Sequence, residues 1–297
     1  MKRLETNGVE LACDAFGAPS DETILLIAGL GTQMIRWTEP FCLELAARGY
    51  HVIRFDNRDA GGSTHISGRA PPDFGDLAAA LGAGRLPDVP YTLYDMAADA
   101  VGLLDALAIG RAHVVGRSMG GMIAQIMACE HPERVMSLTS IMSSTGNSAL
   151  PPPAPDVMAM MAGPAPDPVL DEAGYVAHGL AFARRIAGGG YPFDEAAARR
   201  LIVEEMRRAG DRQGFGRQIA AIAVAGDRRP RLATVTAPTL VIHGSDDPLF
   251  PPACGEDTAA SIPGAELMLM GGMGHDLPAE LYAAVAEAID RTARARR

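Results

Sequence analysis

Ser118 is the residue whose surroundings point most directly to chemistry. It lies in the sequence GRSMG at residues 116–120, after an apolar run that ends at Val115 and before a second apolar segment. The flanking glycines permit a turn too tight for larger side chains. We therefore expect a strand, a sharp turn with the serine at its tip, and a helix whose N-terminus favours negative charge. Such turns can also be purely structural, so a catalytic serine requires partners elsewhere in the chain.

A serine hydroxyl needs a base to become nucleophilic, and that base needs a carboxylate to orient it. His275 follows a predicted strand in a glycine-rich loop, which favours a base over a histidine that only caps the next helix. Asp246 and Asp247 both follow another late strand, and their side chains should point in opposite directions. An aspartate before a proline is also a common turn former, so the residues alone leave both acids open. We expect structural roles for the remaining histidines.

Hydrophobic periodicity predicts the elements that must position these residues. Expected strands are 9–16, 23–28, 50–55, 112–115, 135–141, 238–243 and a part of 262–270. Expected helices are 37–48, 94–108, 119–130 and 277–295, and residues 68–92 are expected to be a loop. Alternating strands and helices imply an α/β protein with a mostly parallel sheet and right-handed crossovers.

Residues 144–232 break this alternation. The segment opens with prolines at 151–153 and shows only helical patterns, near 157–161, 170–187, 193–209 and 214–225. The simplest interpretation is a helical cap, or lid, inserted into the sheet domain. We therefore expect a first core part at 1–143, the cap at 144–232 and a second core part at 233–297.

Composition narrows the classes of function. The chain has 297 residues, of which 48% are hydrophobic, and this is enough for a sizeable core. The net charge of −10 argues against nucleic acid or an anionic membrane as a partner. The four cysteines show no zinc or disulfide spacing, and we find no secretion signal or membrane-spanning run, so a cytoplasmic location is expected. No metal or organic cofactor is implied.

Taken together, five segments make the chain resemble the α/β-hydrolase superfamily over nearly its whole length. They are LLIAGLG (25–31), FDNRDAGGS (55–63), GRSMG (116–120), HGSDDPLFP (243–251) and GMGH (272–275). The resemblance implies the α/β-hydrolase fold, with a central sheet flanked by helices and a cap. In this family the acid lies three residues after the glycine of the fourth segment, which selects Asp247. The family pattern also implies that the backbone amides of Leu30 and Met119 form the oxyanion hole.

Several positions refine or depart from the family pattern. Trp37, the Asn-Arg-Asp stretch and the GMGHDLP ending look most like the aclacinomycin methylesterase group of carboxylic ester hydrolases. Ala28 replaces the usual histidine of the oxyanion motif, which removes a supporting hydrogen bond but no backbone donor. We expect Asp56 to pair with Arg58, and Arg117 to pair with an acid behind the site.

The predicted function is a serine carboxylesterase that acts on small to medium hydrophobic esters through Ser118, His275 and Asp247. A C–C bond hydrolase, a lactonase and a perhydrolase would use the same triad and stay open. From a different class, a ligand-binding receptor on a hydrolase fold also stays open. The expected partner is a small-molecule ester, with no nucleic acid or membrane, and a homodimer is compatible with the sequence.

Overall fold

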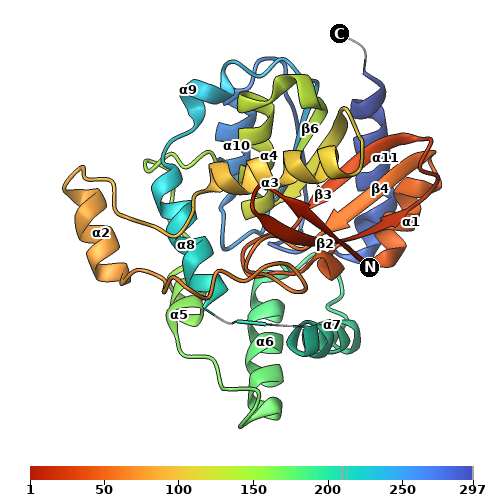
Figure 1. The fold of residues 1–297 in the computed structure, drawn as a ribbon. Coiled ribbons are helices and arrows are strands. Elements are labelled where there is room, and N and C mark those ends of the chain that lie inside the picture. Colours follow the sequence, from red (N-terminus) through yellow and green to blue (C-terminus); the bar gives the residue numbers. More distant parts are fainter. Residues whose placement is uncertain (209, 212, 296–297) are drawn as a thin grey trace.

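A central sheet with helices on both faces forms the body of the protein (Figure 1). The computed structural model describes residues 1–208, 210, 211 and 213–295. Within these residues the sheet has eight strands in the order β1-β2-β4-β3-β5-β6-β7-β8. The strands are β1 (Lys2–Thr6), β2 (Val9–Phe16), β3 (Glu22–Ile27), β4 (Tyr50–Phe55), β5 (Ala112–Arg117), β6 (Val135–Ile141), β7 (Thr239–Gly244) and β8 (Glu266–Met270). The pairs β1–β2 and β2–β4 are antiparallel and all other pairs are parallel, so the expected α/β class is confirmed.

Two layers of helices bury the sheet. One face is covered by α3 (Leu93–Ala106) and α4 (Met119–Glu130), and the other by α1 (Glu39–Ala46) and α11 (Tyr282–Arg294). At one edge, α10 (Pro252–Ser261) packs against β7 and β8. Short 3-10 turns are η1 (Met34–Arg36), η2 (Pro132–Arg134) and η3 (Ala279–Leu281). Strands β4, β5 and β7 are buried along their whole length, as expected for strands covered on both faces.

The register of the sheet brings the motif loops to one edge. Ile27 of β3 lies beside Phe55 of β4 and Gly116 of β5, so the loops that follow these strands are neighbours. Gly244 of β7 pairs with Met270 of β8 in the same way. The carboxyl edge of a parallel sheet is where such folds place their ligand sites.

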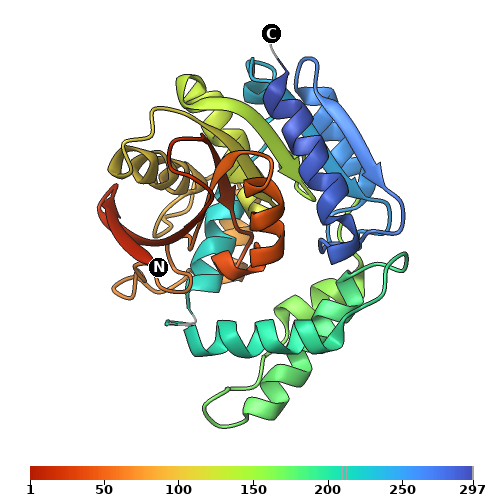
Figure 2. The same ribbon diagram turned by 90° about the vertical axis from the view of Figure 1, so that its right-hand side faces the viewer.

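Between β6 and β7 the chain forms α5 (Pro155–Ala162), α6 (Glu172–Ile186), α7 (Glu195–Arg208), α8 (Gly214–Ala225) and α9 (Arg229–Leu232), and its described residues contain no strand. Helices α6 and α7 pack on each other around Val176, Leu180 and Ile202, apart from the two core clusters of the sheet. Figures 1 and 2 show α5, α6 and α7 below the sheet. That this segment is a cap stays a prediction. Ala209, the expected end of the third helix, and Arg296–Arg297 lie outside the described residues.

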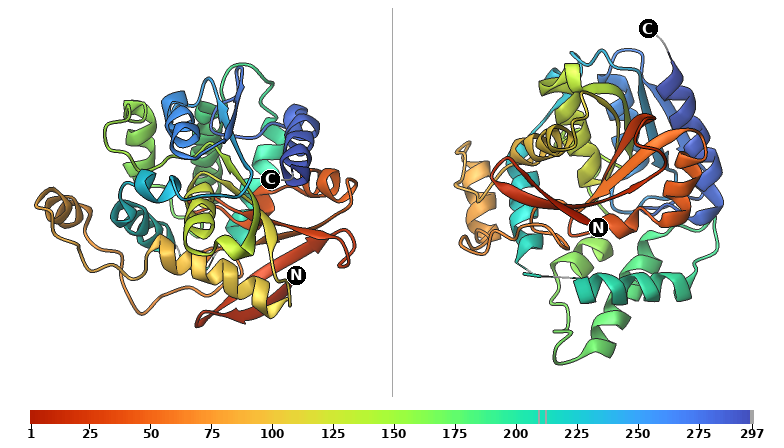
Figure 3. Two further views of the ribbon diagram at one scale, coloured as in Figure 1. Left: turned by 90° about the horizontal axis from the view of Figure 1, so that it is seen from above. Right: turned by 45° about the vertical axis from the view of Figure 1, so that its right-hand side comes forward.

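Apart from the short 3-10 turns, four elements of the described chain were not predicted: β1, α2, α9 and α10. Strand β1 is a short edge strand that pairs only with β2. Helix α2 (Phe74–Gly82) lies within the expected loop 68–92 and packs at the periphery of the molecule beside α8 (Figure 3). It begins at the cap residue Asp73, whose side chain accepts hydrogen bonds from the amides of Gly75 and Asp76. Helix α10 follows the loop that carries Asp247. Since α2 buries only Leu77 and Ala80, its apolar stripe was too short to stand out among glycines and prolines.

No helix within the described residues has both the length and the apolar character needed to cross a membrane.

Candidate active site

Ser118 occupies the sharp turn between β5 and α4. Its φ of +55° lies in the left-handed region that disfavours residues with a side chain. A Cβ atom on Gly116 would lie 2.0 Å from the carbonyl oxygen of Gly120, and one on Gly120 would lie 2.2 Å from that of Ile27. Both glycines are therefore required by the close approach of the backbone. The structure therefore confirms the sharp, glycine-flanked turn that the sequence predicts between a strand and a helix.

The structure brings Ser118, His275 and Asp247 into one chain of hydrogen bonds. Ser118 Oγ lies 3.0 Å from Nε2 of His275, and Nδ1 of the same ring lies 2.7 Å from Oδ2 of Asp247. A carboxylate can only accept, so Nδ1 carries the proton and Nε2 accepts from the serine hydroxyl. The arrangement suits a serine whose proton leaves as its oxygen attacks an electrophile.

Asp247 is itself held in place by backbone donors. Its Oδ1 accepts from the amides of Leu249 and Phe250, each at 2.8 Å, and the side chain is fully buried. The adjacent Asp246 points elsewhere and accepts from the Ser245 hydroxyl at 2.8 Å. The sequence motif alone did not decide between Asp246 and Asp247 as the partner of His275. The structure places Asp247 beside the histidine.

A second histidine, His243, supports the acid loop from the end of β7. Its Nε2 donates to the carbonyl oxygen of Phe250 at 2.7 Å and lies 3.6 Å from Asp247 Oδ2. Burial lowers the pKa of His243 below its usual value, although the Phe250 and Asp247 oxygens oppose the shift. The Phe250 ring packs edge-on against His275, with ring centroids 5.5 Å apart. The sequence predicts a structural role with local hydrogen bonds for His243, and its bond to the Phe250 carbonyl agrees with that expectation.

The loop after β3 packs directly against the serine. A Cβ on Gly29 would lie 3.2 Å from Ser118 Cβ, and the Thr32 amide and hydroxyl both bond to the Gly29 carbonyl, which closes the turn that carries Leu30. Gly31 has a φ of +63° and donates its amide to Gln218 Oε1 of α8 at 2.8 Å. Met119 opens α4, and the first amides of a helix have no partner inside it. The turn that carries Leu30 and the start of α4 thus both lie next to the serine.

The expected pair between Asp56 and Arg58 is wrong. Asp56 is buried and accepts from the Met34 amide and from Arg208 of α7, each at 2.7 Å. Arg58 instead binds Asp99 of α3 through two hydrogen bonds of 2.5 and 2.6 Å. The loop after β4 turns between these residues, so one side chain faces the loop that follows β3 and the other faces a helix. Asp56 therefore connects the loop after β4 to η1 and α7, whereas Asp99 connects the same loop to α3.

Arg117 pairs with an acid, as expected, and the structure identifies that acid as Asp276. Its guanidinium donates to Asp276, the residue after His275, at 3.2 Å. The same guanidinium donates to the carbonyl of Arg36 at 3.3 Å and lies over the Trp37 ring. The pair thus joins the serine turn to the histidine loop.

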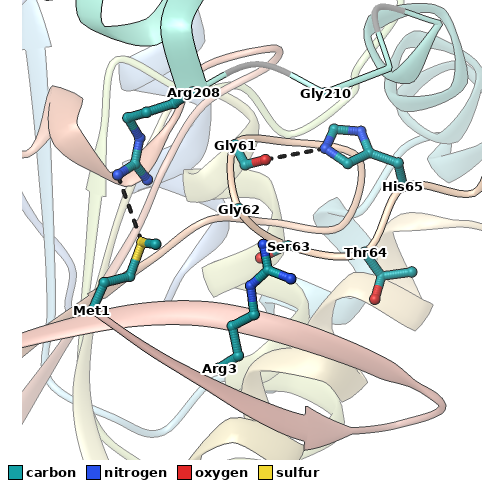
Figure 4. A pocket seen from close by; sticks show the side chains of 9 residues that line it. All are labelled: Met1, Arg3, Gly61, Gly62, Ser63, Thr64, His65, Arg208 and Gly210. Carbon is teal, nitrogen blue, oxygen red and sulfur yellow. Dashed lines mark hydrogen bonds between the residues drawn. The ribbon is translucent and has the colours of Figure 1, made fainter.

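A surface cavity of about 500 Å³ lies apart from these residues (Figure 4). Its lining residues are Met1, Arg3, Gly61, Gly62, Ser63, Thr64, His65, Arg208 and Gly210. None of Ser118, Asp247 and His275 is among them. Within the described part of the chain, no group of three or more histidine, cysteine or acidic side chains is arranged to hold a metal ion.

Comparison with known proteins agrees with the fold and with the motifs. A family model described as alpha/beta hydrolase fold matches residues 22–179. The rhodomycin D methylesterase DnrP of Streptomyces peucetius is 32% identical, over 97% of this chain and 96% of the relative. A putative carbamate hydrolase, RutD of Variovorax paradoxus, is 30% identical over 88% of both chains.

Solved structures match the whole chain. A hydrolase from Pseudomonas aeruginosa PA01 superposes with a TM-score of 0.71 and 28% identity, over 99% of this chain and 98% of the other. An enol-lactonase from Burkholderia xenovorans LB400 reaches a TM-score of 0.72 at 24% identity, over 98% and 99% of the two chains, and shows the shared fold. The resemblance noted from the motifs is thereby confirmed, and the protein is a hydrolase that belongs to the alpha/beta hydrolase fold family.

Proposed function

We propose that this protein is a serine carboxylic ester hydrolase with Ser118 as nucleophile, His275 as base and Asp247 as orienting acid. The observation that carries the proposal is the unbroken relay of contacts, 3.0 Å from serine to histidine and 2.7 Å from histidine to aspartate. A receptor that only binds its ligand has no need for this relay. The methylesterase name of the relatives at 32% identity supports ester cleavage rather than another reaction of the same triad.

In the proposed reaction, Ser118 Oγ attacks the ester carbonyl carbon while its proton passes to His275 Nε2. Asp247 stabilises the resulting imidazolium and holds its orientation. The tetrahedral intermediate then collapses, the C–O bond to the alcohol breaks, and the alcohol leaves with the proton from His275. Water, deprotonated by the same nitrogen, attacks the acyl-serine and releases the carboxylic acid and the free serine.

The backbone amides of Leu30 and Met119 are the proposed donors to the oxyanion. Support comes from the packing of the Leu30 turn against Ser118 and from the position of Met119 at the start of α4. Donors aimed at developing charge are worth about 3 kcal/mol each in barrier height. Because both donors belong to the backbone, replacing Ala28 with the family's histidine would leave their number unchanged.

The proposed substrate is a carboxylic ester with a small alcohol and a hydrophobic acyl part. Apolar side chains border the serine and histidine, among them Met119 and Phe250, and Phe215 of α8 lies against Gly31. We further propose that residues 144–232 act as the cap over this site. The Gln218 contact to the Gly31 amide supports that role, because it joins the inserted segment to the turn that carries Leu30.

Turnover of p-nitrophenyl esters from acetate to decanoate, and of methyl esters of hydrophobic acids, tests the proposal. We expect hydrolysis by the wild type, loss of turnover in Ser118→Ala, and wild-type turnover in the control Ser148→Ala, which alters an exposed serine. A wild type that turns over no ester, or a Ser118→Ala variant that retains full activity, would overturn it. Activity confined to lactones would keep the triad but replace the substrate class.

A further inference from the structure

A short loop of the inserted segment returns to the core and binds the loop that carries His275. We call residues 186–191 the strap; it begins at the last residue of α6, forms the first part of the connection to α7 and contains three consecutive glycines. The amide of His275 donates to the Ile186 carbonyl at 2.6 Å, and that of Gly274 donates to the Ala187 carbonyl at 3.0 Å. Gly190 in turn donates to the Gly272 carbonyl at 2.9 Å. Figure 2 shows the loop between α6 and α7 reaching toward the C-terminal part of the chain.

The two loops approach each other too closely for any side chain. A Cβ on Gly190 would lie 2.6 Å from Gly272 Cα, and one on Gly188 would lie 2.5 Å from the Gly272 carbonyl oxygen. From the other side, a Cβ on Gly274 would lie 2.1 Å from the Ile186 carbonyl oxygen. These neighbours are backbone atoms, which cannot rotate away as the end of a side chain can. The glycines of the GMGH motif are therefore explained by contact with the strap.

A side chain anchors the far end of the strap. Tyr191 is partly buried and packs against the core cluster that contains Met273 and Leu277. These two residues flank His275 in the sequence at distances of two positions on either side. The strap is thus held by backbone hydrogen bonds to the histidine loop and by the packing of Tyr191 against this core cluster.

We propose that the strap positions His275, so that the inserted segment is part of the catalytic arrangement as well as a cover. The histidine must keep two contacts at once, 3.0 Å to Ser118 and 2.7 Å to Asp247. Its own amide and that of Gly274 are both fixed by strap carbonyls, so a displaced strap displaces the imidazole from one or both partners. This inference rests on the proposed function, and it assigns Gly188, Gly190 and Tyr191 a positioning role.

Adjacent glycines provide a matched test. Gly190 and Gly189 both lie outside the left-handed region, so alanine introduces no backbone strain at either position. At Gly190 the new methyl group collides with the histidine loop, whereas at Gly189 its nearest neighbour is Asp246 Oδ2 at 3.7 Å, an ordinary contact. We expect Gly190→Ala to lower kcat about 10- to 100-fold with little change in KM, because small displacements of a catalytic group have effects of this size. Gly189→Ala should match the wild type.

Proton NMR distinguishes positioning from a general loss of structure. The hydrogen-bonded Nδ1 proton between His275 and Asp247 gives a far-downfield signal, which should shift or broaden in Gly190→Ala and stay unchanged in Gly189→Ala. Circular dichroism and the melting temperature establish that each variant is folded. Should Gly190→Ala fail to fold, Tyr191→Ala removes the anchor without creating a clash, and a smaller loss of kcat with the same NMR change is expected.

A folded Gly190→Ala protein with wild-type kcat and an unchanged signal would overturn the strap's role, as would an equal loss in Gly189→Ala. Failure of the proposed function is a separate result, because it appears as a wild type that hydrolyses no ester. In that case the NMR comparison still decides whether the strap positions the histidine.

Discussion

Arg217 of α8 binds Asp59 through two hydrogen bonds of 2.8 Å, and neither side chain is accessible to solvent. The pair joins the inserted segment to the loop that follows β4, and Tyr91 adds a third hydrogen bond to the same carboxylate at 2.6 Å. Burial would raise the pKa of Asp59, but the hydrogen bonds from Arg217 and Tyr91 outweigh it and hold the pKa below its ordinary value. The inserted helices are thus attached to the core by a buried ion pair.

Removing one member of this pair should destabilise the whole protein. Arg217→Ala leaves an uncompensated buried carboxylate, for which the expected cost is about 3–5 kcal/mol in the free energy of unfolding. The control Arg229→Ala breaks the half-exposed pair with Asp227 and should cost less than about 1 kcal/mol. Urea unfolding of the three proteins measures both values. Equal losses in the two variants would show that the Arg217 pair has no special weight.

Stability should also decrease at mildly acidic pH. Burial lowers the pKa of His51, His113 and His243 below the ordinary value of about 6.5. Between the ordinary and the lowered values, the unfolded chain binds protons that the folded chain does not. The free energy of unfolding therefore decreases as the pH falls from about 7 toward 5.

Unfolding curves at several pH values check this expectation. His113→Asn removes one of the three groups and should make the dependence of the unfolding free energy on pH shallower. The free energy of unfolding of each protein at pH 8, where the histidines are neutral in both states, serves as its reference. A free energy of unfolding that stays constant or increases toward pH 5 would contradict the histidine account.

The candidate catalytic residues could be predicted because each lies in a short local sequence motif. Ser118 stood out since its turn requires glycines at fixed neighbouring positions, and the structure confirms the close contacts that exclude other residues there. Strands 50–55 and 135–141 were predicted to the residue, because each is a short segment rich in β-branched and apolar residues that lies between helical patterns. The choice of Asp247 came from the resemblance and agrees with the structure.

Contacts between distant segments could not be predicted in the same way. Gly190 and Gly272 touch, but nothing in either local sequence indicates the other. The same holds for Asp56, whose partner Arg208 lies in the inserted segment, so the neighbouring Arg58 appeared to be the natural partner. Pairings of this kind depend on how the helices between β6 and β7 pack on the core. The hydrophobic periodicity of the sequence predicts the helices but not their packing partners.

The two adjacent acids allow a sharp test of the orienting role. Asp247→Asn keeps the shape of the side chain but can no longer hold the required imidazole tautomer, so kcat should fall by about 10⁴-fold. Asp246→Asn changes a neighbouring residue whose carboxylate bonds to Ser245, and it should remain close to the wild type. Steady-state kinetics on p-nitrophenyl butyrate compares them. A larger loss in Asp246→Asn than in Asp247→Asn would reverse the assignment of the acid.

Covalent labelling by a fluorophosphonate, followed by mass spectrometry of the intact protein and of its peptides, tests whether Ser118 is the nucleophile. We expect one adduct per chain, located on Ser118, with rapid labelling of the wild type and none of Ser118→Ala. Labelling should be slow in His275→Ala, because the serine then has no base. An unlabelled wild type, or an adduct that persists in Ser118→Ala, would contradict the claim that Ser118 is the nucleophile of this hydrolase.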